Sequence, residues 1–504
     1  MGVALERAGN LTRIGGGAHN RGPVAYEWRC LIAVCFGTFM ATMDFSIVNV
    51  ALPTLSREFD RSPDTVVWAT LISSLVVTGI TLTAGRVGDL YGRKRVYITG
   101  WVIFTVGMAI ASFAQNIEQL IAFRFFQAIG VSMAMANGNA IVTEAFPPEE
   151  RGQALGMTGS VVGAGLMSGP IVGGVLLGVF GWQSIFYLRV PIGVIAMTLA
   201  FLFIRPSEPL PAGTSRRLDI PGAVALFGAL SSALLAVNRG QSWGWGSPVI
   251  VGLLIVAVCA LVAFIRIEAR AVSPVVALSL FRVQAFTVGV SSLALSFAGQ
   301  SAVTFLLPFY LQEVKDFSTA QTGLVMATVP SMMLLLSPVS GRVSDRYGFR
   351  HQTTLGIALV SLGLLLMATI DGGTPVPLLV LRLALIGIGT SIFMSPNSSG
   401  IMGSVPRDRL GTASAAVGTA RNIGNATGLA MASAILVGVA TASAGFGAER
   451  LADLPDGALV DGIRTAFVVA ACASAMGIAA SAFRSKQAQP LVVVSAGGPA
   501  AGGK

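Results

Sequence analysis

Three charged side chains lie inside long apolar stretches of the first half of the chain: Asp44, Arg124 and Arg189. A charge inside lipid is costly, so an ionisable group at that depth is a candidate for function. At about 1.5 Å per helical residue, Asp44 lies about 21 Å from the inner end of its expected span. The two arginines lie about 8 and 9 Å from the outer ends of theirs, which is nearly the same level in a ~30 Å hydrocarbon core.

This shared level supports two interpretations of Asp44, the one acid deep in any expected span. The three charges could form a buried ion cluster whose only role is to fix the position of each helix relative to its neighbours. Alternatively, Asp44 could take up and release a proton. A carboxylate suits that role because burial and a neighbouring guanidinium shift a carboxyl pKa in opposite directions.

A second group of charges stands between two apolar runs, in the stretch GRVGDLYGRKRV at 85–96. The stretch GRVSDRYGFR at 341–350 repeats Gly, Arg, Val, Asp, Tyr and Gly in register. A loop that needs only to be polar does not repeat side chains in this way, so we expect a latch that joins two helices of one half and that breaks when the protein changes conformation. The alternative is a basic loop facing the cytoplasm. The candidate latch residues are Gly85, Asp89, Gly92, Arg93, Lys94, Gly341, Asp345 and Gly348.

Glycine recurs every four residues in GLMSGPIVGG at 165–174, which gives one smooth helix face. Pro170 within this stretch removes a backbone donor and kinks the helix. The pattern fits ordinary small-residue packing or a gating helix that includes Gly165, Gly169, Pro170, Gly173 and Gly174. In the second half of the chain, Arg421 and Asn425 place polar groups within a span, where substrate contact and hydrogen bonding between helices are both open.

The elements that must position these residues are membrane spans. The chain has 504 residues, is 54% hydrophobic and only 11% charged, and its mean hydropathy is +0.76. These values exclude an ordinary soluble enzyme and predict an all-α polytopic membrane protein. The expected spans are 29–52, 65–84, 96–114, 119–144, 153–179, 183–204, 219–238, 247–266, 284–311, 319–340, 353–370, 376–400, 410–441 and 462–483.

The charge distribution predicts which side each loop faces. With the N-terminus inside, most Lys and Arg residues fall in cytoplasmic segments, which places both termini in the cytoplasm. The net charge of +10 therefore reflects topology and gives no reason to expect a nucleic-acid partner. The two histidines lie in polar segments and the four cysteines in apolar runs, so we expect no metal site.

The repeated stretch also predicts domain organisation, with two related six-span halves separated by an extra pair of spans. The expected boundaries are a cytoplasmic tail at 1–28, a first six-helix bundle at 29–205, a linker with two extra helices at 206–283, a second six-helix bundle at 284–484 and a cytoplasmic tail at 485–504.

Several motifs resemble those of one family. GRVGDLYGRKR resembles the loop signature of the major facilitator superfamily, and FRFFQAIG at 123–130 resembles its fourth-span arginine motif. MDFSIVNVALP at 43–53, GLMSGPIVGG and LDIPGA at 218–223 resemble motifs of its fourteen-span drug:proton antiporter branch, the multidrug exporters. The resemblance implies the major facilitator fold, two six-helix bundles plus two central spans, working by alternating access.

The resemblance also implies a function and assigns residues to it. We expect proton-coupled export of small amphipathic compounds across the inner membrane, with the proton gradient in place of a cofactor. The expected partners are the substrate, protons and the bilayer, and an accessory envelope protein is left open. Asp44 and Arg124 would couple protons, and the glycine-rich helix would gate.

The chain departs from the family pattern at the presumed cavity. Arg189 stands where the family usually has Asn, and Asn137 and Asn139 stand where it has Pro and small residues. These positions are expected to face the substrate. Three alternatives remain: a lipid or lipid-precursor exporter, which Arg189 would favour, a proton-coupled metabolite symporter, and a non-transporting sensor or enzyme, for which the spans hold no catalytic pair.

Overall fold

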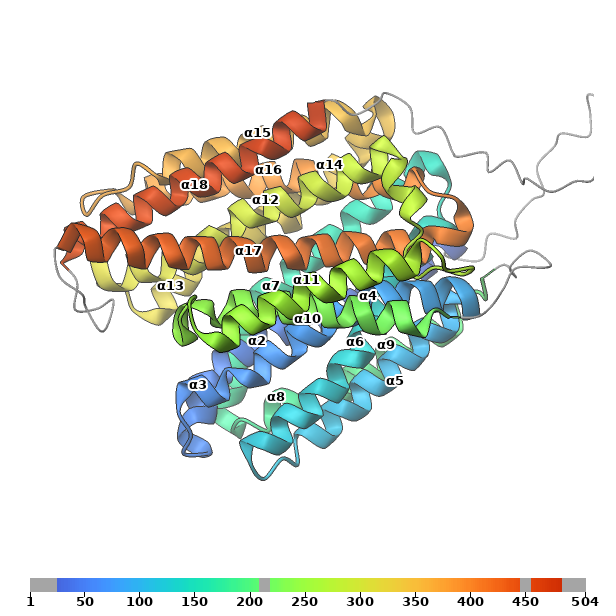
Figure 1. Ribbon diagram of the computed structural model, residues 1–504, viewed down its shortest axis with the longest axis horizontal. Helices are drawn as coiled ribbons and strands as arrows, with labels where there is room; N and C mark the ends of the chain where they lie inside the picture. The colour runs from blue at the N-terminus through green and yellow to red at the C-terminus, as the bar shows by residue number, and fades with distance from the viewer. Residues whose placement is uncertain (1–24, 208–217, 445–454, 483–504) are drawn as a thin grey trace, which may run out of the picture.

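The computed structural model describes residues 25–207, 218–444 and 455–482, and these residues form helices and short connections (Figure 1). Fourteen of the described helices are long and apolar enough to cross a membrane. The expected tails lie outside the described residues, except for 25–28. The main helices are α2 (Tyr26–Glu58), α4 (Trp68–Tyr91), α5 (Arg93–Ala111), α6 (Ile117–Ala145), α7 (Arg151–Phe180), α9 (Val190–Phe203), α10 (Ile220–Trp243), α11 (Pro248–Glu268), α12 (Gln284–Phe309), α14 (Thr328–Tyr347), α15 (Phe349–Met367), α16 (Val376–Gly403), α17 (Leu410–Ala444) and α18 (Asp456–Ala482).

The helices pack in two groups that follow the chain order. Helices α2 to α9 form the first group, and α12 to α18 form the second (Figure 1). Short helices lie at the same end of both groups: α3 (Pro63–Val66) and α8 (Ser184–Tyr187) in the first and α13 (Thr319–Met326) in the second. The two groups meet where α7 packs on α14 and where α17 packs on α4 and α6.

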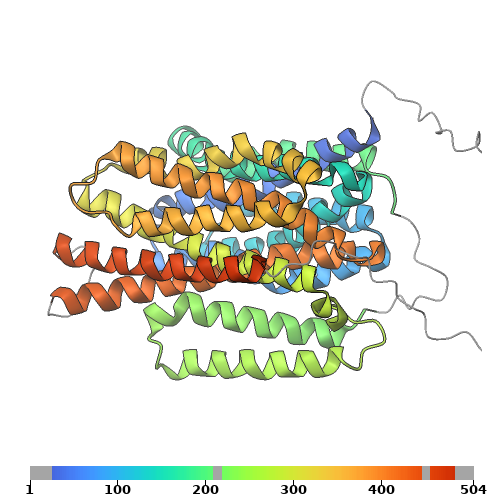
Figure 2. The same cartoon turned by 90° about the horizontal axis from the view of Figure 1, so that it is seen from above.

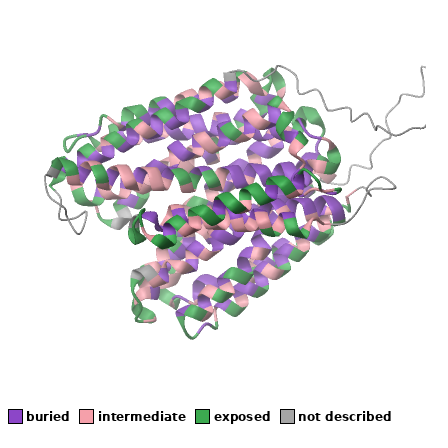
Figure 3. Cartoon of the chain, viewed as in Figure 1, coloured by how far each residue is buried: buried purple, intermediate pink, exposed green. Residues whose placement is uncertain are grey.

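The extra helices α10 and α11 lie along the side of this assembly (Figure 2). Leu234 of α10 packs with Leu71 and Leu75 of α4, and Ala426 of α17 joins the same cluster. The pair therefore covers the line along which α4 meets α17. Helix α11 is exposed along most of its length (Figure 3), as expected for a helix that faces lipid.

The charged stretch at 85–96 is helical, and the expectation of a loop there is wrong. Helix α4 continues to Tyr91, and α5 begins at Arg93. Gly92 alone turns the chain, with φ at 100°, a conformation that side chains rarely adopt. Gly348 does the same between α14 and α15, with φ at 84°. The repeated residues are therefore held rigidly at the end of a helix. We call this end of the molecule, where Gly92 and Gly348 lie, the latch end.

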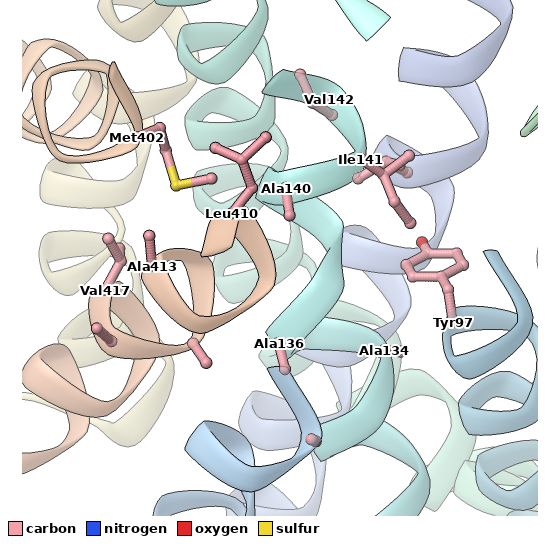
Figure 4. Packing of buried hydrophobic residues seen from close by; sticks show 14 of the residues in the cluster. Tyr97, Ala134, Ala136, Ala140, Ile141, Val142, Met402, Leu410, Ala413 and Val417 are labelled. Carbon is pink, nitrogen blue, oxygen red and sulfur yellow. The ribbon is translucent and has the colours of Figure 1, made fainter. Parts of the chain in front are cut away.

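Small side chains bring the two groups together near the latch end. Figure 4 shows Leu410 of α17 beside Ala140 of α6, with Ala413 further along α17 in the same cluster. All three side chains are buried. Since an alanine face lets two helices approach closely, the first turns of α17 can reach the end of α4.

Candidate functional site

Asp44, Arg124 and Arg189 meet in a buried charge cluster, as their predicted depths suggest. One carboxylate oxygen of Asp44 accepts from Arg124 Nη1 at 2.7 Å, and the other accepts from Arg189 Nη1 at 2.8 Å. Gln127 Nε2 donates to Asp44 Oδ1 at 3.1 Å. Asp44 is 5% exposed and both arginines are 1% exposed. One acid on α2 thus binds two guanidinium groups from other helices.

Each arginine is fixed by further contacts of its own. Arg124 Nε donates to the carbonyl of Ala69 on α4 at 3.1 Å, and its Nη1 donates to Gln127 Oε1 at 2.9 Å. Arg189 lies at the start of α9, and its Nε donates to the carbonyl of Ile185. Sequence reasoning missed Gln127, although it follows Arg124 by three residues and therefore shares its helix face.

The cluster joins three segments of the first group through one buried carboxylate. In this arrangement a cationic donor contacts each carboxylate oxygen, so a proton on Asp44 would compete with both guanidinium groups. Arg124 lies on α6 and Arg189 just before α9, so a shift of either segment relative to α2 would change these contacts. A conformation that separates Asp44 from one arginine would leave a buried charge without its partner. Such a conformation would be costly unless the carboxylate or the guanidinium found a new partner.

Asp89 forms the first latch, and it joins the two helix groups. Its Oδ1 accepts from the backbone N–H of Gly411 at 2.7 Å, and its Oδ2 accepts from the N–H of Thr412 at 2.9 Å and from Thr412 Oγ1 at 3.0 Å. Gly411 and Thr412 lie in the first turn of α17, where unsatisfied amides and the helix dipole favour a carboxylate. The expectation that the latch joins two helices of one half is therefore incomplete: Arg93 of α5 does pair with Asp89 of α4, but the amides that Asp89 binds belong to the other half.

Arg93 extends this latch to two more segments. Its Nη2 donates to Asp89 Oδ1 at 2.9 Å and to the carbonyl of Arg407 at 2.5 Å. Its Nη1 donates to Glu144 Oε2, near the end of α6, at 2.7 Å. Lys94, which we expected in the latch, instead donates to the carbonyl of Phe201 on α9 at 2.7 Å. Arg93 thus anchors the latch to both groups.

Asp345 forms the matching latch in the opposite direction. Its two carboxylate oxygens accept from the backbone N–H groups of Gly152 and Gln153, each at 2.7 Å, in the first turn of α7. The second group therefore contributes an aspartate to a helix of the first group, just as Asp89 reaches from the first group to α17. Phe349 stands where the first copy has Arg93, so the second latch depends on backbone amides.

Glycines bring the backbones together at both latches. A Cβ added to Gly85 would meet the carbonyl of Gly411, and one added to Gly341 would meet the carbonyl of Gly152. The receiving helices are repeats as well: PPEERGQA at 147–154 and PRDRLGTA at 406–413 share Pro, an acid, Gly and Ala in register. This second repeat is the signal that could have marked the two receiving helix starts in the sequence, although it does not say which aspartate each one receives.

The glycines of α7 face two different helices. Cβ atoms added to Gly165 and Gly169 would meet Thr42 and Ser46 of α2, and one added to Gly173 would meet Ile47. Nearer the latch end, the smooth face turns to α14: Gly152, Gly156 and Gly163 approach Gly341, Ser337 and Pro330. Gly174 faces open space, and Pro170 lies inside the helix, within the region that faces α2. Helix α7 therefore packs on its own group at one end and on the other group at the latch end.

A cavity lies between the two groups, against α2, α4, α5, α6 and α7 on one side and α16 and α17 on the other. Of the expected cavity residues, Asn139 and Arg421 line it. Asn137 and Arg189 do not: Asn137 is buried and donates to the carbonyls of Met133 and Ala84, and Arg189 is held by Asp44. Asn425 is exposed and lies off the lining, while its neighbour Asn422 contributes to it.

Alanine at Gly411 tests whether the glycine contact closes the latch end. Because the new Cβ would meet the carbonyl of Gly85, we expect the G411A variant to separate α4 from α17 and weaken the latch by about 1–3 kcal/mol. Spin labels at Arg95 and Asp408 should report a longer and broader distance distribution than in the parent protein. Alanine at Gly174, which faces open space, is the control. Equal distributions in both variants would contradict a closing role for this contact.

The comparisons with known proteins agree with this architecture. The family model of the Major Facilitator Superfamily matches residues 34–429. The riboflavin transporter RibZ of Clostridioides difficile is 37% identical over 80% of this chain and 87% of its own, and the multidrug resistance protein Stp of Mycobacterium tuberculosis (strain CDC 1551 / Oshkosh) is 30% identical over 81% and 75%. The human transporter MFSD10 shares the fold, with a TM-score of 0.64 over 90% of this chain and 99% of its own at 16% identity. The chain belongs to the major facilitator superfamily and is an integral membrane transporter, not an enzyme.

Proposed function

We propose that this protein is a proton-driven exporter of small amphipathic compounds. The observation that carries the proposal is the buried cluster of Asp44 with Arg124 and Arg189. Because both guanidinium groups would compete with a proton for Asp44, we expect proton binding to depend on the positions of their helices. The relative Stp, whose name describes multidrug resistance, supports export of drug-like compounds. The glycine-rich stretch at 165–174, which resembles the antiporter motif, supports export over import.

In the proposed cycle, the latch end faces the cytoplasm, as the distribution of Lys and Arg predicts. The two latches are formed in the described state, so in this cycle the described state is the one closed to the cytoplasm. A proton arriving from outside displaces a guanidinium from Asp44, and the freed helices move. Movement of α4 and α7 breaks the two latches, opens the cytoplasmic side and lets substrate in. Release of the proton to the cytoplasm restores the cluster.

A second candidate is transport of one planar metabolite. The relative RibZ, at 37% identity, is named for riboflavin, and three aromatic residues, Phe45, Tyr97 and Trp101, line the cavity. The lipid-precursor alternative depended on Arg189 facing the substrate. Arg189 is instead paired with Asp44 and does not line the cavity.

Everted membrane vesicles test the proposal. A pH gradient, acidic inside, is imposed and reported by a quenched dye while candidate compounds are added. We expect several unrelated amphipathic compounds to collapse part of the gradient in vesicles that contain the protein and not in vesicles that lack it. A response to riboflavin alone would support the second candidate, and no response to any compound would contradict proton-coupled export.

The Arg189→Asn variant separates a coupling role from a substrate-selecting role for this arginine. Because Arg189 contacts Asp44 at 2.8 Å, we expect the variant to lower pH-driven transport at least tenfold for every substrate. The relative rates among substrates should remain as in the parent protein. A changed order of substrates with unchanged coupling would show that Arg189 acts on substrate instead.

A further inference from the structure

The cavity between the two helix groups carries one positive charge and no negative charge among its described lining residues. Its lining is made of aliphatic, aromatic, hydroxyl and amide side chains, with one charged residue, Arg421. No aspartate or glutamate is found among the described residues that line it. The site is therefore a mostly apolar chamber with a single positive charge.

Among the described residues, Arg421 has no partner that would explain its position. It lies on α17, eleven residues after Leu410, which is about 16 Å along the helix and well inside the membrane core. Within the described part of the chain it forms no hydrogen bond and no ion pair. Arg93, Arg124 and Arg189, which hold helices together, each bind a carboxylate. An unpaired cation at this depth is costly to keep and marks a place for a negative group.

A second polar group without a partner lies on the same face of α17. Ser414 is seven residues before Arg421, two helical turns away, and both line the cavity. The Ser414 side chain is 2% exposed, and its hydroxyl has no partner among the described residues. The helix thus presents a hydroxyl and a guanidinium to one ligand.

Aromatic side chains line the cavity from the first helix group. Tyr97 and Trp101 of α5 lie edge to face with ring centroids 6.0 Å apart, and Phe45 of α2 also lines the cavity. Aromatic rings bind flat ring systems well, by offset or edge-to-face contact. Tyr97 and Trp101 are themselves buried, at 2% and 1% exposed, so the half-buried Phe45 is the ring of the first group that a planar ligand can contact. Helix α17 in the second group offers the positive charge.

We propose that this cavity selects planar aromatic compounds that carry a negative charge, with the anionic group bound by Arg421, and that it discriminates against cations of the same shape. This proposal rests on the proposed export function and names its substrate class. The discrimination has two sources: Arg421 attracts the anion, and in an apolar chamber the same charge repels a cation that finds no carboxylate to pair with.

Two xanthene dyes of nearly the same shape and opposite charge provide the test. Carboxyfluorescein is an anion, and rhodamine 123 is a cation. Uptake of each dye into everted vesicles is driven by a pH gradient, acidic inside, and the retained dye is measured after filtration and lysis at a fixed pH. We expect the gradient to drive carboxyfluorescein uptake at least tenfold faster than rhodamine 123 uptake.

Variants at Arg421 assign this preference to the side chain. We expect Arg421→Gln to lose at least nine-tenths of carboxyfluorescein uptake and to gain rhodamine 123 uptake, so that the preference reverses. Arg421→Lys keeps the positive charge and should keep the preference. Arg266→Gln removes an exposed arginine of α11, outside the cavity, and is the matched control.

The outcomes separate this proposal from the function on which it rests. Gradient-driven uptake of rhodamine 123 in preference to carboxyfluorescein would overturn the anion proposal and leave proton-driven export standing. An unchanged preference in Arg421→Gln would overturn the role of Arg421. If the Arg421→Gln variant does not insert into the membrane, the anion proposal is judged on the dye preference of the parent protein and of Arg421→Lys. If neither these dyes nor any other compound responds to the gradient, export fails and this proposal fails with it.

Discussion

Replacing Asp44 by Asn should abolish proton-coupled transport, with pH-driven uptake falling to the level of vesicles without the protein. The variant mimics a permanently protonated acid, so it can neither take up nor release the proton that drives the cycle. Both guanidinium groups also lose their anionic partner, and breaking a buried pair in this way costs about 3–5 kcal/mol. We therefore expect a lower melting temperature as well, measured on the purified protein by thermal unfolding.

Two further measurements keep the loss of coupling apart from a loss of folding. Asp44→Glu retains a carboxylate and should retain part of the pH-driven uptake. Asp44→Asn should still bind substrate, which can be measured by fluorescence polarisation of a bound dye. Asp461→Asn, which removes an exposed carboxylate on α18, is the control for charge. Full pH-driven transport by Asp44→Asn would remove Asp44 from the coupling role.

Replacing Asp89 by Asn should open the latch end. The carboxylate accepts from two backbone amides and a hydroxyl of α17 and pairs with Arg93. An amide side chain loses the charge-assisted part of these bonds, which we expect to weaken the closed state by about 1–3 kcal/mol. Because each 1.4 kcal/mol is a tenfold change, the equilibrium should shift by about one to two decades toward the state open at the latch end.

A cysteine reporter in the cavity measures this shift. In a background without the four native cysteines, Cys30, Cys35, Cys259 and Cys472, a single cysteine replaces Ser398 of the cavity lining. A membrane-impermeant thiol reagent added from the latch side should label it faster in the Asp89→Asn variant and more slowly from the opposite side. Unaltered labelling on both sides, together with normal transport, would contradict the latch.

The second latch should respond in the same direction and more weakly. Asp345 is held by two backbone amides, and Phe349 provides no guanidinium in the place of Arg93. Since both latches bias one two-state equilibrium, the free-energy effects of Asp89→Asn and Asp345→Asn should add in the double variant. A double variant that behaves like Asp89→Asn alone would show that the second latch does not contribute to closure.

The sequence predicts the helices well because hydropathy and length determine them directly. It also predicts the charge cluster, because the depth of Asp44, Arg124 and Arg189 follows from counting residues along spans of known length. Gln127 adds to the cluster without any signal of its own in hydropathy. The position of a polar residue within a span does not say which neighbouring helix its side chain faces.

Helix pairing is what the sequence left undetermined. Asp89 and Asp345 are recognisable as a repeat, but a repeat does not say which helix receives each carboxylate, and in a membrane all helix faces are similarly apolar. The exchange between halves depends on the close approach of Gly85 to Gly411, which only the packed structure reveals. Arg189 was expected in the cavity for the same reason. Its depth in the membrane does not say whether its side chain faces Asp44 or the cavity.

The most direct test of the account measures whether substrate and proton drive each other. Purified protein is reconstituted into liposomes that contain a pH-sensitive dye, and carboxyfluorescein or another transported compound is applied as a gradient with no initial pH difference. We expect the substrate gradient to move protons in the opposite direction and an imposed pH gradient to move substrate, because coupling is reciprocal. The Asp44→Asn variant should do neither. Substrate movement that leaves the internal pH unchanged in the parent protein would contradict proton-coupled export.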